Sequence, residues 1–225
     1  MAVLGEIKMK VVLITGLKND FDKELAAAFA KADFKVYAMA NDQIEGVNLL
    51  SSEMKEAAAA LKKESGHIDI YIDVSDERSP FDNFTVRGSL NDKVMRELYD
   101  ANVTRPMALL ETFLPLLESG EGKRLCFLTS AQASINETRE TDGYGYKMAK
   151  AALHNFLQIT RNVLAPKGFI IRAFDPSRNE VPAEAAAQAA LNYFVRRRGV
   201  ERGDERRDDE GNLVLRDACG RQHPW

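Results

Sequence analysis

Short runs of apolar, β-branched residues alternate along this chain with longer stretches in which apolar residues recur every three or four positions. The short runs predict buried strands, and the longer period predicts helices that pack one face against a sheet. We expect strands at residues 11–15, 34–39, 68–73, 124–129 and 169–174. We expect helices at residues 21–31, 51–63, 91–99, 103–117, 145–164 and 182–197, with the helices at 91–99 and 103–117 close enough to be continuous.

Strands that alternate with helices predict an α/β fold in which helices cover both faces of a parallel sheet. Right-handed crossovers then give a doubly wound, Rossmann-like arrangement with three αβα layers. The chain has no internal repeat and no linker that would divide it, so we expect residues 1–225 to form a single Rossmann-like domain.

Composition narrows the classes of function. The 225 residues are 45% hydrophobic and carry a net charge of −3, so no overall field attracts nucleic acid or an anionic membrane. No apolar run reaches membrane-spanning length and no secretory signal opens the chain, which favours the cytoplasm. Two cysteines do not make a disulfide framework, and we expect no metal site.

The stretch from Gly168 onward contains ten arginines and no lysine, interleaved with a similar number of acidic residues. A nucleic-acid patch over 196–210 is one interpretation. We favour a solvated, charge-balanced segment because the signs alternate and no aromatic residues are interleaved. A subunit contact is also open, since arginine suits bidentate pairs with carboxylates.

Candidate chemistry centres on Tyr146 and Lys150, which lie four residues apart on a predicted helix and therefore share a face. A lysine beside the phenol would lower the pKa of Tyr146 and suit it for proton transfer near neutral pH. Ser130 ends a predicted strand, at the edge where open α/β sheets bind ligands. Thr129 and Ser134 are competing hydroxyls.

The order of motifs resembles the short-chain dehydrogenase/reductase family, and the end of the chain resembles its small C-factor-like members. The residues that carry the resemblance are Thr15-Gly16, Asn102-Val103, Leu128-Thr129-Ser130, Gly143-Tyr144-Gly145-Tyr146, Lys150, Asp175-Pro176 and Pro224-Trp225. The resemblance implies that Tyr146 is the catalytic acid/base and that Lys150 tunes it and binds the nicotinamide ribose. It implies that Ser130 hydrogen-bonds the substrate oxygen and that Asn102 holds a water in the proton relay.

The cofactor end departs from the family pattern. Of the glycines expected after the first strand only Gly16 remains, and Asp20 and Asp22 occupy the other two positions. Two unit charges about 4 Å apart interact with about 4 kcal/mol at an effective dielectric near 20, so these carboxylates oppose a phosphate. They also suit a helix start, which would then supply its own anion. We therefore expect weak dinucleotide binding.

Several other positions also differ from the residues that are usual in the family. Asp73-Val74-Ser75-Asp76 replaces Asn-Asn-Ala-Gly, and Ser177 follows Pro176 where glycine is usual. The end of the second strand lacks the acid expected for NAD and the arginine expected for NADP. The candidate cofactor contacts are Thr15, Gly16, Lys18, Asn41, Asn48, Lys150 and Pro176.

These residues favour an atypical oxidoreductase that transfers hydride between NAD or NADP and a small carbonyl or alcohol substrate. The alternatives are a non-redox proton-transfer enzyme of the isomerase or dehydratase type without NAD(P), and a catalytically silent binding or assembly subunit. Apolar residues around the helices at 103–117 and 145–164 predict a homodimer or homotetramer.

Overall fold

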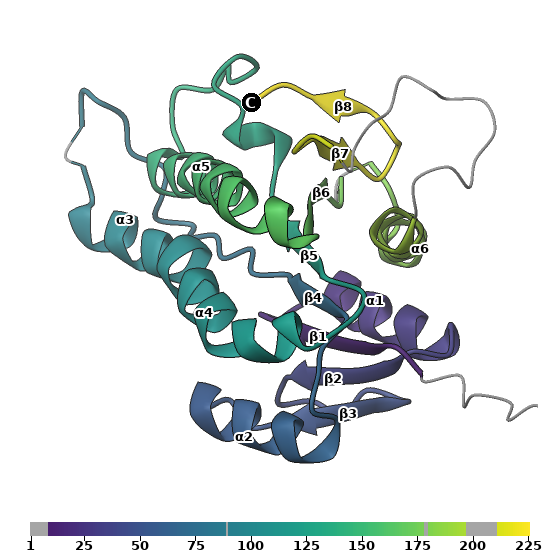
Figure 1. Cartoon of the computed structure of the whole chain (residues 1–225). Helices are drawn as coiled ribbons and strands as arrows, with labels where there is room; N and C mark the ends of the chain where they lie inside the picture. The colour runs from purple at the N-terminus through teal and green to yellow at the C-terminus, as the bar shows by residue number, and fades with distance from the viewer. Residues whose placement is uncertain (1–8, 89, 178–179, 197–210) are drawn as a thin grey trace, which may run out of the picture.

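The computed structural model describes residues 9–88, 90–177, 180–196 and 211–225, and one sheet runs through them. Its strand order is β3-β2-β1-β4-β5-β6-β7-β8, and all neighbouring pairs are parallel except β7 and β8 (Figure 1). The strands are β1 Val11–Thr15, β2 Lys35–Met39, β3 Val47–Leu50, β4 Ile70–Asp73, β5 Arg124–Leu128, β6 Ile170–Asp175, β7 Leu215–Asp217 and β8 Gln222–His223.

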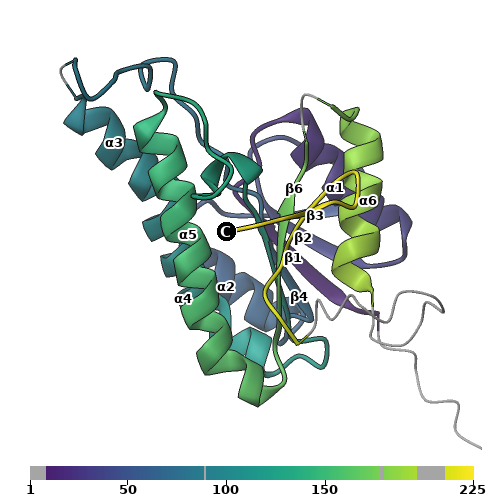
Figure 2. The ribbon, with the colours of Figure 1, turned by 90° about the horizontal axis from the view of Figure 1, so that it is seen from above.

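Helices cover both faces of the sheet, which confirms the predicted doubly wound α/β fold (Figure 2). The helices are α1 Asp20–Lys31, α2 Met54–Glu64, α3 Asp92–Tyr99, α4 Arg105–Glu118, α5 Tyr144–Leu164 and α6 Ala183–Val195. Helices α1 and α6 pack together on one face, and α2, α4 and α5 cover the other, with α3 against α5. Alternate residues of β1 enter the two cores, Leu13 on the α5 side and Ile14 on the α1 side.

The five predicted strands are present with ends that differ by at most two residues, but three short strands were not expected. Strand β3 lies at the edge of the sheet and has only four residues, of which the middle two are exposed. Its sequence therefore lacks the long apolar run that would predict a buried strand. Strands β7 and β8 follow the arginine-rich stretch. In β7, beyond the segment expected to be solvated, Arg216 and Asp217 are buried. Residues 197–210, which carry most of that prediction, lie outside the described residues.

Helices α3 and α4 are continuous through a π-helical turn, Asp100–Thr104, which carries Asn102. A π-turn adds one residue to the helical repeat and often occurs at functional sites. Here it presents Asn102, fully buried, toward the segment that follows β4. The carboxyl ends of β1, β4, β5 and β6 gather polar residues at the same edge of the sheet, where ligands bind in this class of fold.

Across the described ranges, no helix is both long and apolar enough to span a bilayer.

Candidate active site

Tyr146 and Lys150 lie on the first two turns of α5 and point toward the chain that leaves β4. The Tyr146 hydroxyl donates to Asp76 Oδ1 at 2.6 Å, and the phenol oxygen accepts from Arg78 Nη2 at 2.7 Å. The Arg78 guanidinium also lies 4.0 Å from the centre of the Tyr146 ring. Lys150 Nζ donates to the backbone oxygens of Ser75 (2.5 Å) and Leu128 (3.2 Å) and lies 3.5 Å from Asp76 Oδ1.

This arrangement raises the pKa of Tyr146 well above its usual value, because the phenol is buried and Asp76 is a nearby acceptor with negative charge. Arg78 and Ser130 act in the opposite direction. The expectation that Lys150 lowers the pKa of Tyr146 is therefore wrong for this structure, since the Asp76 carboxylate stands beside both groups. Burial lowers the pKa of the Lys150 amine, against the charges of Asp76 and Asp73, which raise it.

Ser130 follows β5, and its hydroxyl oxygen accepts from the backbone N–H of Gln132 at 3.2 Å. It lines a cavity of about 370 Å3 together with Asp76 and Arg78, and it lies close enough to the Tyr146 phenol to lower the pKa of that group. The competing hydroxyls are engaged elsewhere: Thr129 bonds to the buried ring of His154, and Ser134 accepts from the Glu137 N–H.

The Asn102 side chain forms hydrogen bonds with both the backbone N–H and the backbone carbonyl of Glu77. Its Oδ1 accepts from the Glu77 N–H at 3.0 Å, and its Nδ2 donates to the carbonyl oxygens of Glu77 and Leu98, both at 2.9 Å. These bonds fix the segment that carries Asp76 and Arg78 in front of Tyr146. The role in a water relay stays a prediction.

Asp82, which sequence reasoning missed, holds the start of α5. Its two carboxylate oxygens accept from the backbone N–H groups of Gly145 (2.8 Å) and Tyr146 (2.7 Å). The residue before the helix, Gly143, supplies no side-chain cap, so a carboxylate from a distant loop takes that role. A Cβ on Gly145 would lie 2.8 Å from Leu98 Cδ1 and 3.1 Å from Asp82 Oδ1, so a side chain there would require these groups to shift.

The predicted phosphate loop after β1 is closed by its own side chains. Asn19 caps α1, and Asp22, which is fully buried, accepts from the backbone N–H groups of Lys18 (2.8 Å) and Asn19 (3.1 Å). The expectation that this helix start supplies its own anion agrees with these bonds for Asp22; Asp20 lies in the first turn. Backbone N–H groups at a helix start would otherwise be free to bind phosphate.

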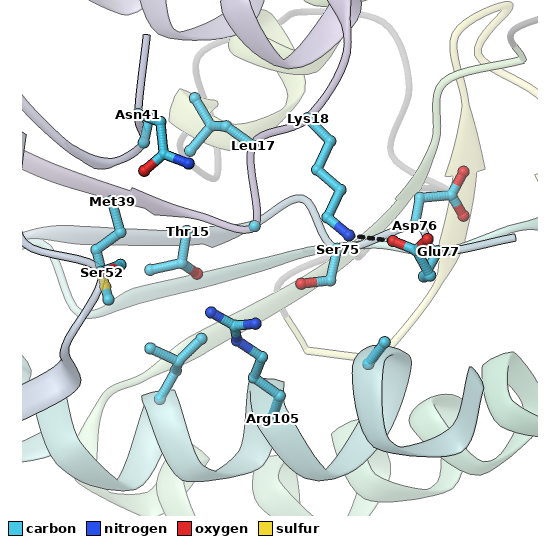
Figure 3. A pocket seen from close by; sticks show the side chains of 14 residues that line it. Thr15, Leu17, Lys18, Met39, Asn41, Ser52, Ser75, Asp76, Glu77 and Arg105 are labelled. Carbon is cyan, nitrogen blue, oxygen red and sulfur yellow. Dashed lines mark hydrogen bonds and ion pairs between the residues drawn. The ribbon is translucent and has the colours of Figure 1, made fainter. Parts of the chain in front are cut away.

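A second cavity, of about 260 Å3, lies between the ends of β1 and β2 and the start of α4 (Figure 3). Lys18 reaches across its mouth to form an ion pair with Glu77. Arg105 extends into it from the first turn of α4, toward Thr15 and Ser75. Within the described part of the chain, the Arg105 guanidinium forms no hydrogen bond or ion pair. Asp76 lines both cavities and so stands at their boundary.

The remaining candidate cofactor residues do not lie together: some line the 260 Å3 cavity, one lines the cavity beside Ser130, and one lies in neither. Gly16 and Asn41 line the 260 Å3 cavity, whereas Pro176 lines the cavity beside Ser130. Thr15 lines the smaller cavity, but its hydroxyl donates to Asp73 Oδ2 at 2.8 Å. Asn48 lies on edge strand β3, where it donates to the Val36 carbonyl oxygen at 2.9 Å and lines neither cavity.

The profile of the short chain dehydrogenase family matches residues 10–192. This protein belongs to the short-chain dehydrogenase family. The sequence-based family prediction is thereby confirmed, and membership supports an oxidoreductase.

Two curated relatives and one solved structure illustrate the likeness of this family member to known proteins. An uncharacterized oxidoreductase of Schizosaccharomyces pombe is 29% identical over 137 residues, which are 60% of this chain and 53% of the relative. The C-signal of Myxococcus xanthus is 27% identical over 89 residues, 40% of this chain and 54% of the relative, which agrees with the C-factor-like resemblance. The chain thus spans about half the length of each of these two relatives.

The solved structure is a carbonyl reductase from Pseudomonas aeruginosa in complex with NADP. It superposes with a TM-score of 0.75 at 18% identity and covers 96% of this chain and 100% of that chain. At this identity the match shows the shared fold alone.

Sequence reasoning also missed the positions of Asp76, Arg78 and Arg105 in the site. Asp76 was visible as a departure from Asn-Asn-Ala-Gly, but its contact with Tyr146 spans 70 residues and depends on the path of a loop. Ser177, where glycine is usual, adopts a φ of +49°, in the left-handed region that favours glycine. The backbone there keeps a glycine-like conformation although the residue has changed.

Proposed function

We propose that this chain is an atypical short-chain oxidoreductase that transfers hydride between NAD(P) and a small carbonyl or alcohol substrate. The observation that carries the proposal is the meeting of Ser130, Tyr146 and Lys150 at one end of the sheet, beside a cavity of about 370 Å3. The sequence alone predicts a catalytic role for all three residues, and Tyr146 is buried near Ser130 rather than exposed to bulk solvent.

In this proposal the substrate oxygen binds between Ser130 and Tyr146. Ser130 accepts a backbone hydrogen bond from Gln132, so its own proton is available to a carbonyl oxygen. Tyr146 supplies or removes the proton as general acid or base. The 370 Å3 cavity is lined mainly by polar side chains, including Arg78, Gln132 and Arg221, which suits a small polar substrate.

The residues present fit a dinucleotide only in part. The Lys18 and Asn19 N–H groups are taken by Asp22, and Asp76 stands beside Lys150 where a ribose hydroxyl would bond. Arg105 nevertheless directs positive charge into the cavity that also contains Gly16 and Asn41, and Lys18 lies at its mouth, paired with Glu77. We therefore propose weak binding in which Arg105 and Lys18 hold the phosphates and Lys150 the nicotinamide ribose. When bound, the nicotinamide ring supplies or accepts the hydride.

A second candidate function is proton transfer without NAD(P). The carboxylates of Asp22 and Asp76 favour this function. They accept hydrogen bonds from the Lys18 N–H and the Tyr146 hydroxyl, which a dinucleotide and its substrate would otherwise use. Tyr146 and Ser130 would keep their roles in such an enzyme.

The test is a titration of the protein with NADH and NADPH, followed by cofactor fluorescence, together with an assay of small carbonyl and alcohol substrates. An oxidoreductase binds at least one dinucleotide and turns over only in its presence. Tyr146→Phe should then lower turnover by about 10²–10⁴-fold, the usual contribution of general acid/base catalysis, with cofactor binding unchanged. Turnover in fully cofactor-free protein would instead support the second candidate.

We also propose that the protein acts as a homodimer or homotetramer on a small-molecule substrate. On the outer face of α4 and α5, Met107, Ile159 and Val163 are 40%, 56% and 60% exposed and surround a shallow hollow of about 730 Å3. Apolar side chains gathered in this way favour an isologous contact with a second copy.

A further inference from the structure

The hydrogen bonds around the Tyr146 phenol have a defined direction. The hydroxyl proton points at Asp76 Oδ1, 2.6 Å away, while Arg78 Nη2 donates to the phenol oxygen at 2.7 Å. The Asp76 side chain is only 6% exposed, and its Oδ1 also lies 3.5 Å from Lys150 Nζ. A charge-assisted O–H to carboxylate bond is short and strong, so this is a built contact between two groups that can exchange a proton.

We propose that Asp76 is the proton partner of Tyr146 and that the two groups act as a dyad. The inference rests on the proposed function only in taking Tyr146 as the acid/base. Asp76 was not among the catalytic candidates suggested by the sequence, and it stands where the family pattern has a glycine.

The proton balance is simple. When a substrate hydroxyl gives its proton to the Tyr146 oxygen, the original phenol O–H bond breaks and that proton passes to Asp76 Oδ1. The substrate is left as an alkoxide and Asp76 becomes a neutral carboxylic acid. In the reverse direction Tyr146 protonates an alkoxide and recovers a proton from the Asp76 acid. Arg78 stabilises whatever negative charge the phenol oxygen carries during the transfer.

The surroundings favour this role. Lys150 and Arg78 supply positive charge on the two sides of the dyad, Ser130 lies near the phenol, and Asp73 faces Lys150 from β4. Asp76 lines both the 260 Å3 and the 370 Å3 cavities, so a proton received from Tyr146 has a short route to water. The adjacent Glu77 is paired with Lys18 instead.

The first experiment needs neither cofactor nor substrate. An alkaline titration of phenolate absorbance is recorded for the wild type and for Asp76→Asn, and each curve is corrected by subtracting its Tyr146→Phe counterpart. Since Asp76 raises the pKa of Tyr146 through its charge and its hydrogen bond, the Tyr146 phenol should ionise at lower pH in Asp76→Asn. Asp92→Asn, which replaces an exposed carboxylate on α3, should leave the Tyr146 curve unchanged.

A second measurement tests the proposal even if Asp76→Asn fails to fold, because it uses the wild type. In the wild type, the phenolic proton should give a downfield proton resonance that exchanges slowly with water, and this signal should vanish in Tyr146→Phe. Asp76→Glu, which keeps the carboxylate, should retain such a signal. The absence of the resonance in the wild type, or an unchanged Tyr146 titration in folded Asp76→Asn, would overturn the proposal.

Where a substrate is available, Asp76→Asn should lower kcat by about 10²–10⁴-fold and abolish the acid limb of the pH profile for alcohol oxidation. A wild-type acid limb that persists in Asp76→Asn would speak against the dyad. Failure of NAD(P)H binding would remove the oxidoreductase proposal and leave the phenol titration to decide the role of Asp76.

Discussion

The Asp22 carboxylate accepts a hydrogen bond of 2.8 Å from the backbone N–H of Lys18. It accepts a second bond from Asn19, and the Asn19 side chain in turn accepts from the Asp22 N–H at 3.3 Å. The start of α1 is thus satisfied from within the chain, at the place where related folds bind phosphate.

Replacing both acids, in Asp20→Gly with Asp22→Gly, should raise the affinity for NADH or NADPH. The change removes two negative charges and frees the Lys18 and Asn19 N–H groups. Cofactor fluorescence titration measures the effect. Asp20→Gly alone is the matched control, because it removes a charge without freeing the amides, and it should produce the smaller gain.

The double variant loses a helix cap, so its stability should fall by about 0.5–2 kcal/mol. An affinity no greater than that of the wild type in a folded double variant would mean that the loop does not bind the cofactor phosphates.

Arg105→Met should weaken dinucleotide binding by about tenfold or more, since a hydrogen bond to a charged group contributes about 1.5–3 kcal/mol. The guanidinium is placed in the 260 Å3 cavity. Binding should also become less sensitive to salt. Lys93→Met removes an exposed cation on α3 and serves as the control with unchanged affinity. Equal affinities for wild type and Arg105→Met would place the phosphates elsewhere.

Asp82→Ala should destabilise the protein by about 0.5–2 kcal/mol, the usual effect of losing a helix cap. Two backbone N–H groups, of Gly145 and Tyr146, lose their acceptor. Chemical denaturation measures the change, and Asp82→Asn should recover part of it by keeping one acceptor oxygen. If Asp82→Ala is as stable as the wild type, the cap has been replaced by another group and the assignment is wrong.

His223 on β8 predicts a pH-dependent contribution to stability. Burial lowers the pKa of its ring, but hydrogen bonds to Asp217 (2.9 Å) and Glu137 (3.1 Å) outweigh burial, so the pKa is raised above the usual value. A raised pKa in the folded state gives stability that is fully present below the unfolded pKa and is lost as the pH rises through the folded one.

The difference in unfolding free energy between wild type and His223→Gln should therefore be larger at about pH 5 than at about pH 8, on either side of the unperturbed value near 6.5. Urea denaturation at the two pH values measures it. A difference that is the same at both, or larger at high pH, would contradict the ion pairs.

Light scattering at micromolar concentration should report a dimer or tetramer, and Ile159→Glu with Val163→Glu should shift it to monomer. Both side chains are more than half exposed on α5, so the charges disturb an interface without entering the core. The matched control is Gln158→Glu, which alters an already polar position on the same helix. A monomeric wild type would exclude the proposed assembly.

Local pattern was enough to predict most of the fold. Fully buried, mainly apolar runs such as residues 11–15 and 124–128 leave little choice of structure, and helical spacing placed Tyr146 and Lys150 on one face. Strands β7 and β8 could not be predicted, since pairing with β6 rather than composition buries Arg216 and Asp217.

The sequence predicts those site residues whose positions are determined by strands and helices, but not those whose positions depend on the path of a loop. Ser130 and Tyr146 come together because a parallel sheet and a following helix determine both positions. The contact of Asp76 with Tyr146 depends on how residues 74–82 cross the sheet edge, which Asn102 and Asp82 fix through backbone hydrogen bonds. No local spacing in the sequence encodes those bonds.

The structure explains the glycine at position 16 without reference to the cofactor motif in which it occurs. Its φ is +84°, and a Cβ there would lie 2.5 Å from Ser75 Oγ and 2.7 Å from Ser75 N. The loops after β1 and β4 therefore touch at a point where any side chain would force them apart. A glycine is required at this crossing whether or not a dinucleotide ever enters, so its presence reports the geometry of two neighbouring loops and is not by itself a sign of cofactor use.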